Sequence, residues 1–236
     1  MICILSTDTH HHRYFINRII DSGIDVGKIY FETTSVKPKF IVSPFFENET
    51  EEYESSRFFQ DVSQELPEVD IMISKTINDE QVQNDLQKLN PSLGIVFGTR
   101  LVKPHIIDKF KTGLINVHRG IAQEYRGLDS DLWAIYHKDF KDIGVTIHFI
   151  DNSLDTGDIV SQDRLDSRKD MEIFHLRYYT TVMATDLVIT AAEEYLAGRI
   201  QRTPQTKFGR YYSFMPLDLK HDVARKFKKH VSKLQC

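Results

Sequence analysis

The sequence predicts an α/β fold: a doubly wound, Rossmann-like, mostly parallel sheet with a small carboxyl-terminal appendage. Short apolar runs typical of buried strands alternate with segments whose apolar residues recur at helical spacing. Glycine closes one predicted strand at Gly98 and one predicted helix at Gly23. Alternating strand and helix signals favour a parallel sheet with helices on its faces, and ligands in such folds gather at the carboxyl ends of the strands.

The predicted strands and helices follow one another along the chain. The strands are Met1–Ser6, Val26–Phe31, Val69–Ser74, Leu93–Phe97, Leu114–His118 and Gly144–Ile150, with Asp158–Ser161 as a short partner strand. The shorter helices comprise one with Phe15, Ile16, Ile19 and Ile20 on a single face, one inside the acidic and aromatic stretch Ser43–Gln60, then Asp79–Leu89, Pro104–Phe110 and a helix beginning over Asp129–Tyr136.

A long helix is predicted from about Met171 to Ala197, with Asp170 as its N-cap and Gly198 just past its end. One face of this helix carries an apolar stripe, which indicates core packing. The stripe consists of Leu176, Tyr179, Met183, Leu187 and Ala191.

Length and composition describe a soluble protein. The chain has 236 residues, 41% hydrophobic and 27% charged, and its net charge of −4 makes a broad nucleic-acid-binding surface unexpected. No apolar run approaches the roughly 20 residues that cross a bilayer, and Met1–Ser6 is too short for a signal sequence, so we expect a cytosolic protein without a membrane span. Cys3 and Cys236 are expected to be free thiols, and two such residues form no zinc site.

The character of the chain changes near residue 200, so we predict a main domain over residues 1–200 and a short segment over 201–236. Lys207–Met215 is rich in aromatic residues, and Lys220–Lys233 is basic and weakly amphipathic. A segment this short cannot hold a core of its own. It should dock on the main domain or on a second copy, and we expect a homodimer.

Several common site motifs are absent. There is no G-x-G-x-x-G, no G-x-S-x-G, and the sequence G-I-D-V-G-K starting at Gly23 is too short for a P-loop. The run of His10, His11 and His12 lacks metal-ligand spacing and is expected to be a solvated loop after the first strand. Its position at a strand end still allows a contact with a substrate.

Asn116 and His118 are two residues apart on a predicted strand, so their side chains project to the same face, while Val117 points into packing. An amide can donate to a developing oxyanion, and an imidazole can donate or accept a proton. Taken alone, the pair is explained at least as well by a turn-forming asparagine and a core histidine.

The segment Leu154–Ile159 reads L-D-T-G-D-I and follows the strand Gly144–Ile150. A carboxylate at Asp155 could orient His118 or relay a proton through water. Taken alone, the segment also fits a plain turn whose aspartates bond to local backbone amides.

Together these pieces closely resemble the folate-dependent formyltransferase family. The matched signature is N-x-H, Y-R-G, G-V-T-I-H and L-D-T-G-D-I, in this order between Gly113 and Ile159. The resemblance is strong over Leu93–Leu165 and weak over the rest of the first 200 residues. It is greatest to the compact nucleotide-sugar N-formyltransferases, which pair this domain with a short carboxyl-terminal piece.

The resemblance implies formyl transfer from 10-formyltetrahydrofolate, a co-substrate, without a metal. It implies that Asn116, His118 and Asp155 are the catalytic residues, and that the pterin lies between two segments near the strand ends. The residues of these segments are Phe97, Gly98, Thr99, Arg100, Leu101, Ile150, Asp151 and Asn152.

The acceptor is expected to be a nucleotide-linked amino sugar, with dTDP-4-amino-4,6-dideoxyglucose as the best candidate. Many relatives follow the histidine motif with a serine and Leu-Leu-Pro, whereas this chain continues from His118 with R-G-I-A, so its acceptor loop differs. Candidate acceptor contacts are His10, Arg13, Lys75, Tyr125 and Arg126, and Tyr211, Tyr212 and Phe214 either stack on a base or form a small core. A methionyl-tRNA acceptor, a purine-pathway acceptor and a non-catalytic binding module are the alternatives.

Overall fold

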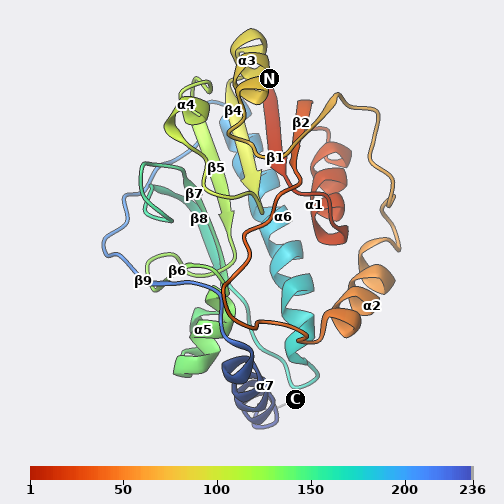
Figure 1. Cartoon of the computed structure of the whole chain (residues 1–236), viewed down its shortest axis with the longest axis vertical. Coiled ribbons are helices and arrows are strands. Elements are labelled where there is room, and N and C mark those ends of the chain that lie inside the picture. The colour runs from red at the N-terminus through yellow and green to blue at the C-terminus, as the bar shows by residue number, and fades with distance from the viewer. Residues whose placement is uncertain (235–236) are drawn as a thin grey trace.

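A seven-stranded sheet with the order β3-β2-β1-β4-β5-β7-β8 forms the centre of the computed structural model, which describes residues 1–234 (Figure 1). β1 to β5 pair in parallel, and β7 pairs antiparallel with both of its neighbours, β5 and β8, which confirms the predicted mostly parallel sheet. The strands are β1 (Ile2–Ser6), β2 (Val26–Glu32), β3 (Ile71–Ser74), β4 (Leu93–Phe97), β5 (Gly113–His118), β7 (Gly144–Phe149) and β8 (Ile159–Arg164). Cys236, expected to be a free thiol, lies outside the described residues.

Helices cover both faces of this sheet. They are α1 (His10–Asp21), α2 (Glu47–Phe58), α3 (Glu80–Leu89), α4 (Pro104–Ile107), α5 (Ser130–His137), α6 (Leu176–Leu196) and α7 (Leu217–Val231), with 3-10 turns η1 (Phe140–Asp142) and η2 (Ile173–His175). Two short strands, β6 (Tyr125–Gly127) and β9 (Arg210–Tyr212), pair to form a second sheet.

The apolar residues of β1 show why the sheet is buried on both faces. Ile2 and Ile4 pack in the cluster that contains residues of α1 and α6. Cys3 and Leu5 point to the opposite face, into the cluster formed with α3 and α4. Burial raises the pKa of the Cys3 thiol to about 12, so this residue behaves as a small apolar core residue.

The carboxyl-terminal segment docks on the same chain. Val223, Phe227 and Val231 of α7 are buried in a cluster with Leu132 and Ile135 of α5. This agrees with the expectation that the segment is too short to hold its own core. The boundary near residue 200 and the homodimer stay predictions.

The prediction that the three histidines form a solvated loop is wrong. His10, His11 and His12 do not form a solvated loop but the first turn of α1. The His12 ring is 5% exposed and packs edge-on against Phe97 at 4.6 Å between centroids. Thr9, the N-cap residue, bonds to the ring of His12 instead of a backbone N–H, with 2.7 Å between Oγ1 and Nδ1.

The long helix also starts later than predicted, because Asp170 is not its N-cap. Glu172 and His175 form a reciprocal capping box around η2, and α6 begins at Leu176. Leu176 and Ala191 of the predicted stripe are buried, but the most buried face of α6 is displaced from its other three residues. It carries the small residues Thr180, Ala184 and Val188, which let the helix lie close to the sheet, while Tyr179, Met183 and Leu187 are partly buried.

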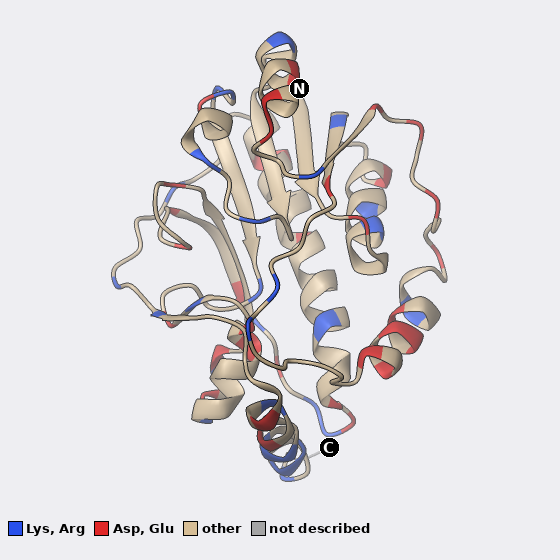
Figure 2. Ribbon diagram, in the orientation of Figure 1, with Lys and Arg blue, Asp and Glu red and all other residues tan. Residues whose placement is uncertain are grey.

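Charged side chains are distributed unevenly over these elements (Figure 2). Acidic residues concentrate on α2, and the last turn of α7 is basic with Lys228, Lys229 and His230. Within residues 1–234, no helix is long and apolar enough to cross a membrane.

Candidate active site

A cavity of about 1000 Å³ lies at the carboxyl ends of the parallel strands. The cavity is lined by residues at the ends of four strands. They are residues 7–9 after β1, Glu32 at the end of β2, residues 97–102 at and after the end of β4, and residues 116–119 at and after the end of β5. β1 lies between β2 and β4, and the chain crosses from β3 at the edge of the sheet to β4 on the other side of β1, which opens a crevice at this point of the sheet.

Asn116 lies on β5 opposite His148 of β7, in the antiparallel pair of strands. The Asn116 Nδ2 atom is 3.2 Å from His148 Nε2, and His148 Nδ1 is 2.8 Å from the carbonyl oxygen of Phe149. Nδ1 therefore donates to the carbonyl, and Nε2 accepts one N–H of the amide. The second N–H of Asn116 is available to a ligand in the cavity.

His118 lies on the same face of β5 as Asn116 and is 5% exposed. Its Nε2 donates to the carbonyl oxygen of Tyr125 at 2.8 Å, and its Nδ1 is 3.6 Å from Asp155 Oδ2. Both neighbours are hydrogen-bond acceptors, so the geometry suits a ring that donates from both nitrogens.

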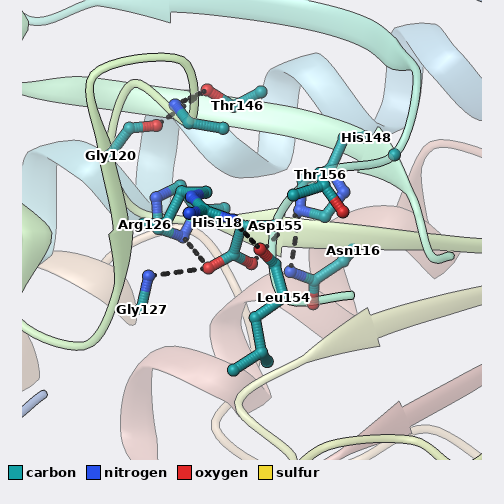
Figure 3. A network of polar contacts seen from close by, with 12 residues as sticks. Asn116, His118, Gly120, Arg126, Gly127, Thr146, His148, Leu154, Asp155 and Thr156 are labelled. Atoms are coloured by element: carbon teal, nitrogen blue, oxygen red, sulfur yellow. Dashed lines mark hydrogen bonds and ion pairs between the residues drawn. The ribbon is translucent and has the colours of Figure 1, made fainter. Parts of the chain in front are cut away.

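Asp155 joins these groups into one cluster (Figure 3). Its Oδ2 accepts the N–H of Gly127 at 2.8 Å, and its Oδ1 is 3.4 Å from His148 Nε2. Burial alone raises the pKa of Asp155, but the charge of His118 and the backbone amide of Gly127 outweigh it and hold the pKa well below its ordinary value. The carboxylate is therefore ionised at neutral pH.

The loop after His118 is held in place by Thr146 of β7. The Thr146 hydroxyl donates to the carbonyl of Gly120 at 2.8 Å and accepts the N–H of Ala122 at 3.1 Å. A Cβ atom on Gly120 would lie 2.7 Å from His118 Nε2 and 2.6 Å from Ser130 Cβ. Glycine therefore lets the chain pass close to the imidazole, and the loop has a defined conformation.

The predicted cofactor segments are largely on the cavity wall. The residues that line it are Phe97, Gly98, Thr99, Arg100, Leu101 and Ile150. Glu32 fixes the first segment: its buried carboxylate accepts the backbone N–H of Arg100 at 2.8 Å and the Nε–H of the same residue at 2.7 Å. Gly98 has a φ of +83°, and a Cβ there would lie 2.2 Å from His12 Nε2.

Asp151 and Asn152 do not line the cavity. The carboxylate of Asp151 accepts the Ser153 N–H at 2.9 Å and the Thr156 hydroxyl at 2.8 Å. Asp151 therefore closes its own turn, and Ser153 and Leu154 are the residues of this loop that reach the cavity beside Asp155.

The five predicted acceptor contacts are not gathered on the cavity wall. His10 lies 3.3 Å from the Ser55 hydroxyl, measured at Nδ1, and Arg13 forms an ion pair with Asp8 at 2.5 Å. Lys75 is an exposed residue after β3. A role for these three side chains in binding stays a prediction.

Tyr125 and Arg126 support the site from behind. The Tyr125 hydroxyl donates to Asp139, while its carbonyl holds His118. Arg126 donates from Nε to the carbonyl of Gly209 at 2.7 Å and from Nη1 to that of Leu154 at 3.3 Å. The geometry therefore links Arg126 to the loop that carries Asp155.

The wall residues to which sequence reasoning gave no role include Glu32, Arg119 and His148. His148 belongs to the recognised G-V-T-I-H piece, and the pairing of its strand with β5 was the signal that could have identified it. Tyr211 reaches the wall because β9 pairs with β6. Arg119 was noted only as a departure from the family pattern.

Comparisons with known proteins find similarity in sequence and in fold. A family model described as "Formyl transferase" matches residues 41–177. A methionyl-tRNA formyltransferase from Finegoldia magna is 33% identical over 128 residues, which are 54% of this chain and 41% of that protein. The chain thus spans less than half the length of this curated relative.

Solved structures of low sequence identity share the fold. A sugar N-formyltransferase from a Shewanella species superposes with a TM-score of 0.64 at 14% identity, over 96% of this chain and 87% of that one. The formyltransferase PseJ from Anoxybacillus kamchatkensis, in complex with UDP-4,6-dideoxy-4-formamido-L-AltNAc and tetrahydrofolate, gives 0.56 at 20% identity, over 90% and 86%.

The matched model covers more than half of the 236 residues and includes Asn116, His118 and Asp155. The mostly parallel strand order agrees with this match. The chain belongs to the formyl transferase family.

Proposed function

We propose that this protein transfers a formyl group from 10-formyltetrahydrofolate to the amine of a nucleotide-linked amino sugar. The observation that carries the proposal is the cluster of Asn116, His118 and Asp155 on the wall of one cavity. The best candidate acceptor is dTDP-4-amino-4,6-dideoxyglucose, a building block for bacterial surface polysaccharide. We expect the reaction to occur in the cytosol, in a homodimer.

The cavity suits a folate on one side. Leu101, Val102 and Ile73 give that side an apolar lining, which favours a flat ring system, and the ion pair between the buried Glu32 and the partly exposed Arg100 keeps the adjoining segment rigid. A bound formyl-folate supplies an activated formyl group. Residues 97–101 and Ile150 would hold its pterin ring.

Asn116 is placed to stabilise charge during transfer. As the acceptor amine forms a bond to the formyl carbon, negative charge builds on the formyl oxygen, and the available N–H of Asn116 can donate to it. The bond from this carbon to the folate nitrogen then breaks, the nitrogen takes up a proton, and the amine loses one. His148 fixes the amide at 3.2 Å throughout.

His118 and Asp155 act mainly through charge in this proposal. His118 Nε2 already donates to the carbonyl of Tyr125, so donation to the folate nitrogen would require that bond to break. Stabilisation of negative charge by the ring requires no such change. The low pKa of Asp155 makes it a weak base, suited to holding the ring and to stabilising the amine as it becomes positive, with water taking the proton.

The fold neighbours support a sugar acceptor. Their names include sugar N-formyltransferases, and the Anoxybacillus kamchatkensis structure holds a UDP-sugar together with tetrahydrofolate. The altered loop after His118 also supports an acceptor different from that of the tRNA-directed members.

Methionyl-tRNA is the second candidate, because the sequence relative from Finegoldia magna acts, by its name, on this acceptor. The net charge of −4 and the acidic helix α2 argue against a tRNA surface. We therefore expect weak, salt-sensitive tRNA binding. Tight and specific association in a filter-binding measurement would instead favour this second candidate.

The proposal is tested with 10-formyltetrahydrofolate and a panel of acceptors: dTDP-, UDP- and GDP-linked amino sugars and charged methionyl-tRNA. Mass spectrometry of the acceptor detects an added formyl group directly. Formylation of an amino sugar, dependent on His118, is the expected result. Transfer to methionyl-tRNA alone, or to none of the panel, would contradict the sugar assignment.

A further inference from the structure

Arg119 is a cation on the cavity wall whose charge is poorly compensated. Its Nη1 atom is buried and has no hydrogen-bond partner within residues 1–234. Its ion-pair partner is Asp131, with Nη2 and Oδ2 4.0 Å apart, the outer limit of an ion pair. A guanidinium has five N–H donors, and buried donors in folded proteins are almost always satisfied.

No carboxylate within residues 1–234 forms a hydrogen bond with Arg119. Asp131 is itself engaged, because its Oδ1 accepts the N–H of Leu132 at 2.8 Å. Burial lowers the pKa of His12 to about 3, and the charge of Arg119 is the next largest cause, so the field of the guanidinium reaches the start of α1. The guanidinium therefore places a positive charge on this part of the wall, beside the carboxylates of Asp129 and Asp131.

The position of Arg119 is set by the loop that also sets His118. It is the next residue after His118, and Thr146 holds the following Gly120 and Ala122. The side chain of Arg119 is 25% exposed and lines the same cavity as Asn116 and Asp155. A ligand group bound there lies beside the reacting centre, on a preorganised backbone.

We propose that Arg119 binds an oxyanion of the amine acceptor, a phosphate or a carboxylate, and thereby selects anionic acceptors. The proposal rests on the proposed formyl transfer and adds the acceptor's charge to it. Guanidinium groups bind both kinds of oxyanion through paired N–H donors. Within this inference, the R-G-I-A sequence after His118 is a specificity feature of the acceptor site.

The test is calorimetric titration of the full chain with three probes of the anion: UDP, inorganic phosphate and malonate. The variants are Arg119→Gln, Arg119→Lys and Asp131→Asn. Arg199→Gln is the matched control, since Arg199 is exposed and paired with Glu194 at the end of α6. Tetrahydrofolate is titrated separately into every variant.

We expect Arg119→Gln to weaken binding of the anion roughly tenfold or more, and Arg119→Lys to retain part of the affinity. Asp131→Asn removes the competing carboxylate while its amide oxygen can still accept the Leu132 N–H, so it should bind the anion more tightly. Opposite shifts from these two changes are not expected if Arg119 only supports the fold. UDP and phosphate binding identify a phosphate acceptor, and malonate binding alone identifies a carboxylate.

Equal anion affinity in Arg119→Gln and the wild type, or a wild type that binds none of the three probes, would overturn the proposal. Tetrahydrofolate affinity should be unchanged in all variants. A wild-type chain that binds an anion through Arg119 but fails to bind tetrahydrofolate would overturn the proposed formyl transfer and leave the anion site standing.

Discussion

His148 is expected to position Asn116 without touching the substrate. His148→Phe removes the acceptor of the Asn116 N–H and the contact with Asp155, so kcat should fall about tenfold, the effect of one hydrogen bond. KM for 10-formyltetrahydrofolate should change little. His148→Gln, whose carbonyl can accept the same N–H, should recover part of kcat in steady-state assays with the identified acceptor. A wild-type kcat in His148→Phe would show that His148 does not position Asn116 for the reaction.

The lowered pKa of His12 predicts that the folded protein becomes less stable as the pH falls. Its pKa is about 3 in the folded protein, mainly through burial, and near 6.5 when unfolded. Between these values the unfolded chain binds the extra proton, so the free energy of unfolding should fall with falling pH by up to about 1.4 kcal/mol per unit.

Urea denaturation at pH 7, 6 and 5 measures this dependence. His12→Gln should show a shallower loss of stability than the wild type, and the exposed His221→Gln serves as the control with the wild-type slope. The same slope in His12→Gln and the wild type would show that His12 takes up its proton equally well in both states.

Motif order grouped Asn116, His118 and Asp155, because N-x-H and L-D-T-G-D-I contain these residues, and the structure places them together, while their catalytic role stays a prediction. It was not enough to predict His148, whose position depends on the register between β5 and β7. It also placed Asp151 at the cofactor, although this carboxylate closes its own turn. The spacing of residues along one strand does not show which residues it will contact on a neighbouring strand, or which side chains will bond within a turn.

Among the elements, the buried strands were predictable because short, continuous apolar runs such as Leu93–Phe97 are typical of strands buried in the core. β6 and β9 were not predicted, since three residues are too few to show a period. Their parallel pairing joins segments more than 80 residues apart, Tyr125 with Arg210, and brings the tail to the cavity. The start of α6 was misplaced because the capping box belongs to η2.

Gly127 connects β6, β9 and Asp155, so its replacement should damage both stability and activity. It has a φ of +92°, and a Cβ there would lie 2.0 Å from the carbonyl oxygen of Tyr212. Gly198 is a matched control, with a φ of +70° and no atom within 4 Å of the added Cβ.

Both alanine variants carry backbone strain of roughly 1 kcal/mol, and only Gly127→Ala adds the clash. We expect Gly127→Ala to lower the free energy of unfolding clearly more than Gly198→Ala, and to lower kcat because the bond from Gly127 to Asp155 is disturbed. Chemical denaturation and initial rates provide both readouts. Equal stability and equal kcat in the two variants would contradict the role of Gly127.

At the scale of the whole molecule, the carboxyl-terminal segment after residue 200 contributes side chains to the hydrophobic core. Met215, Val223, Phe227 and Val231 are buried against α5, and each such side chain contributes about 1.5–3 kcal/mol. Truncation after Arg202 should therefore remove a large fraction of the roughly 5–15 kcal/mol of a typical domain and leave an unstable, inactive chain. Circular dichroism and an activity assay of the truncated protein check this. A folded, fully active truncated chain would contradict it.

The predicted homodimer is tested on the intact protein. Phe208 and Tyr211 remain 69% and 55% exposed, so this part of the tail offers apolar surface to a second copy, and a two-fold dimer is the commonest arrangement. Sedimentation should show a dimer. A monomer at all concentrations would rule it out without affecting the burial of α7.

The central claim is that Asn116, His118 and Asp155 carry formyl transfer. The most direct test is the kcat for transfer from 10-formyltetrahydrofolate in Asn116→Ala, with His118→Ala and Asp155→Ala beside it. Asn84→Ala on the exposed surface of α3 is the control and should match the wild type. The account predicts that Asn116→Ala loses about 3 kcal/mol of transition-state stabilisation, a fall in kcat of about 100-fold or more, and that the other two lose at least as much. Near wild-type turnover in any of the three would contradict it.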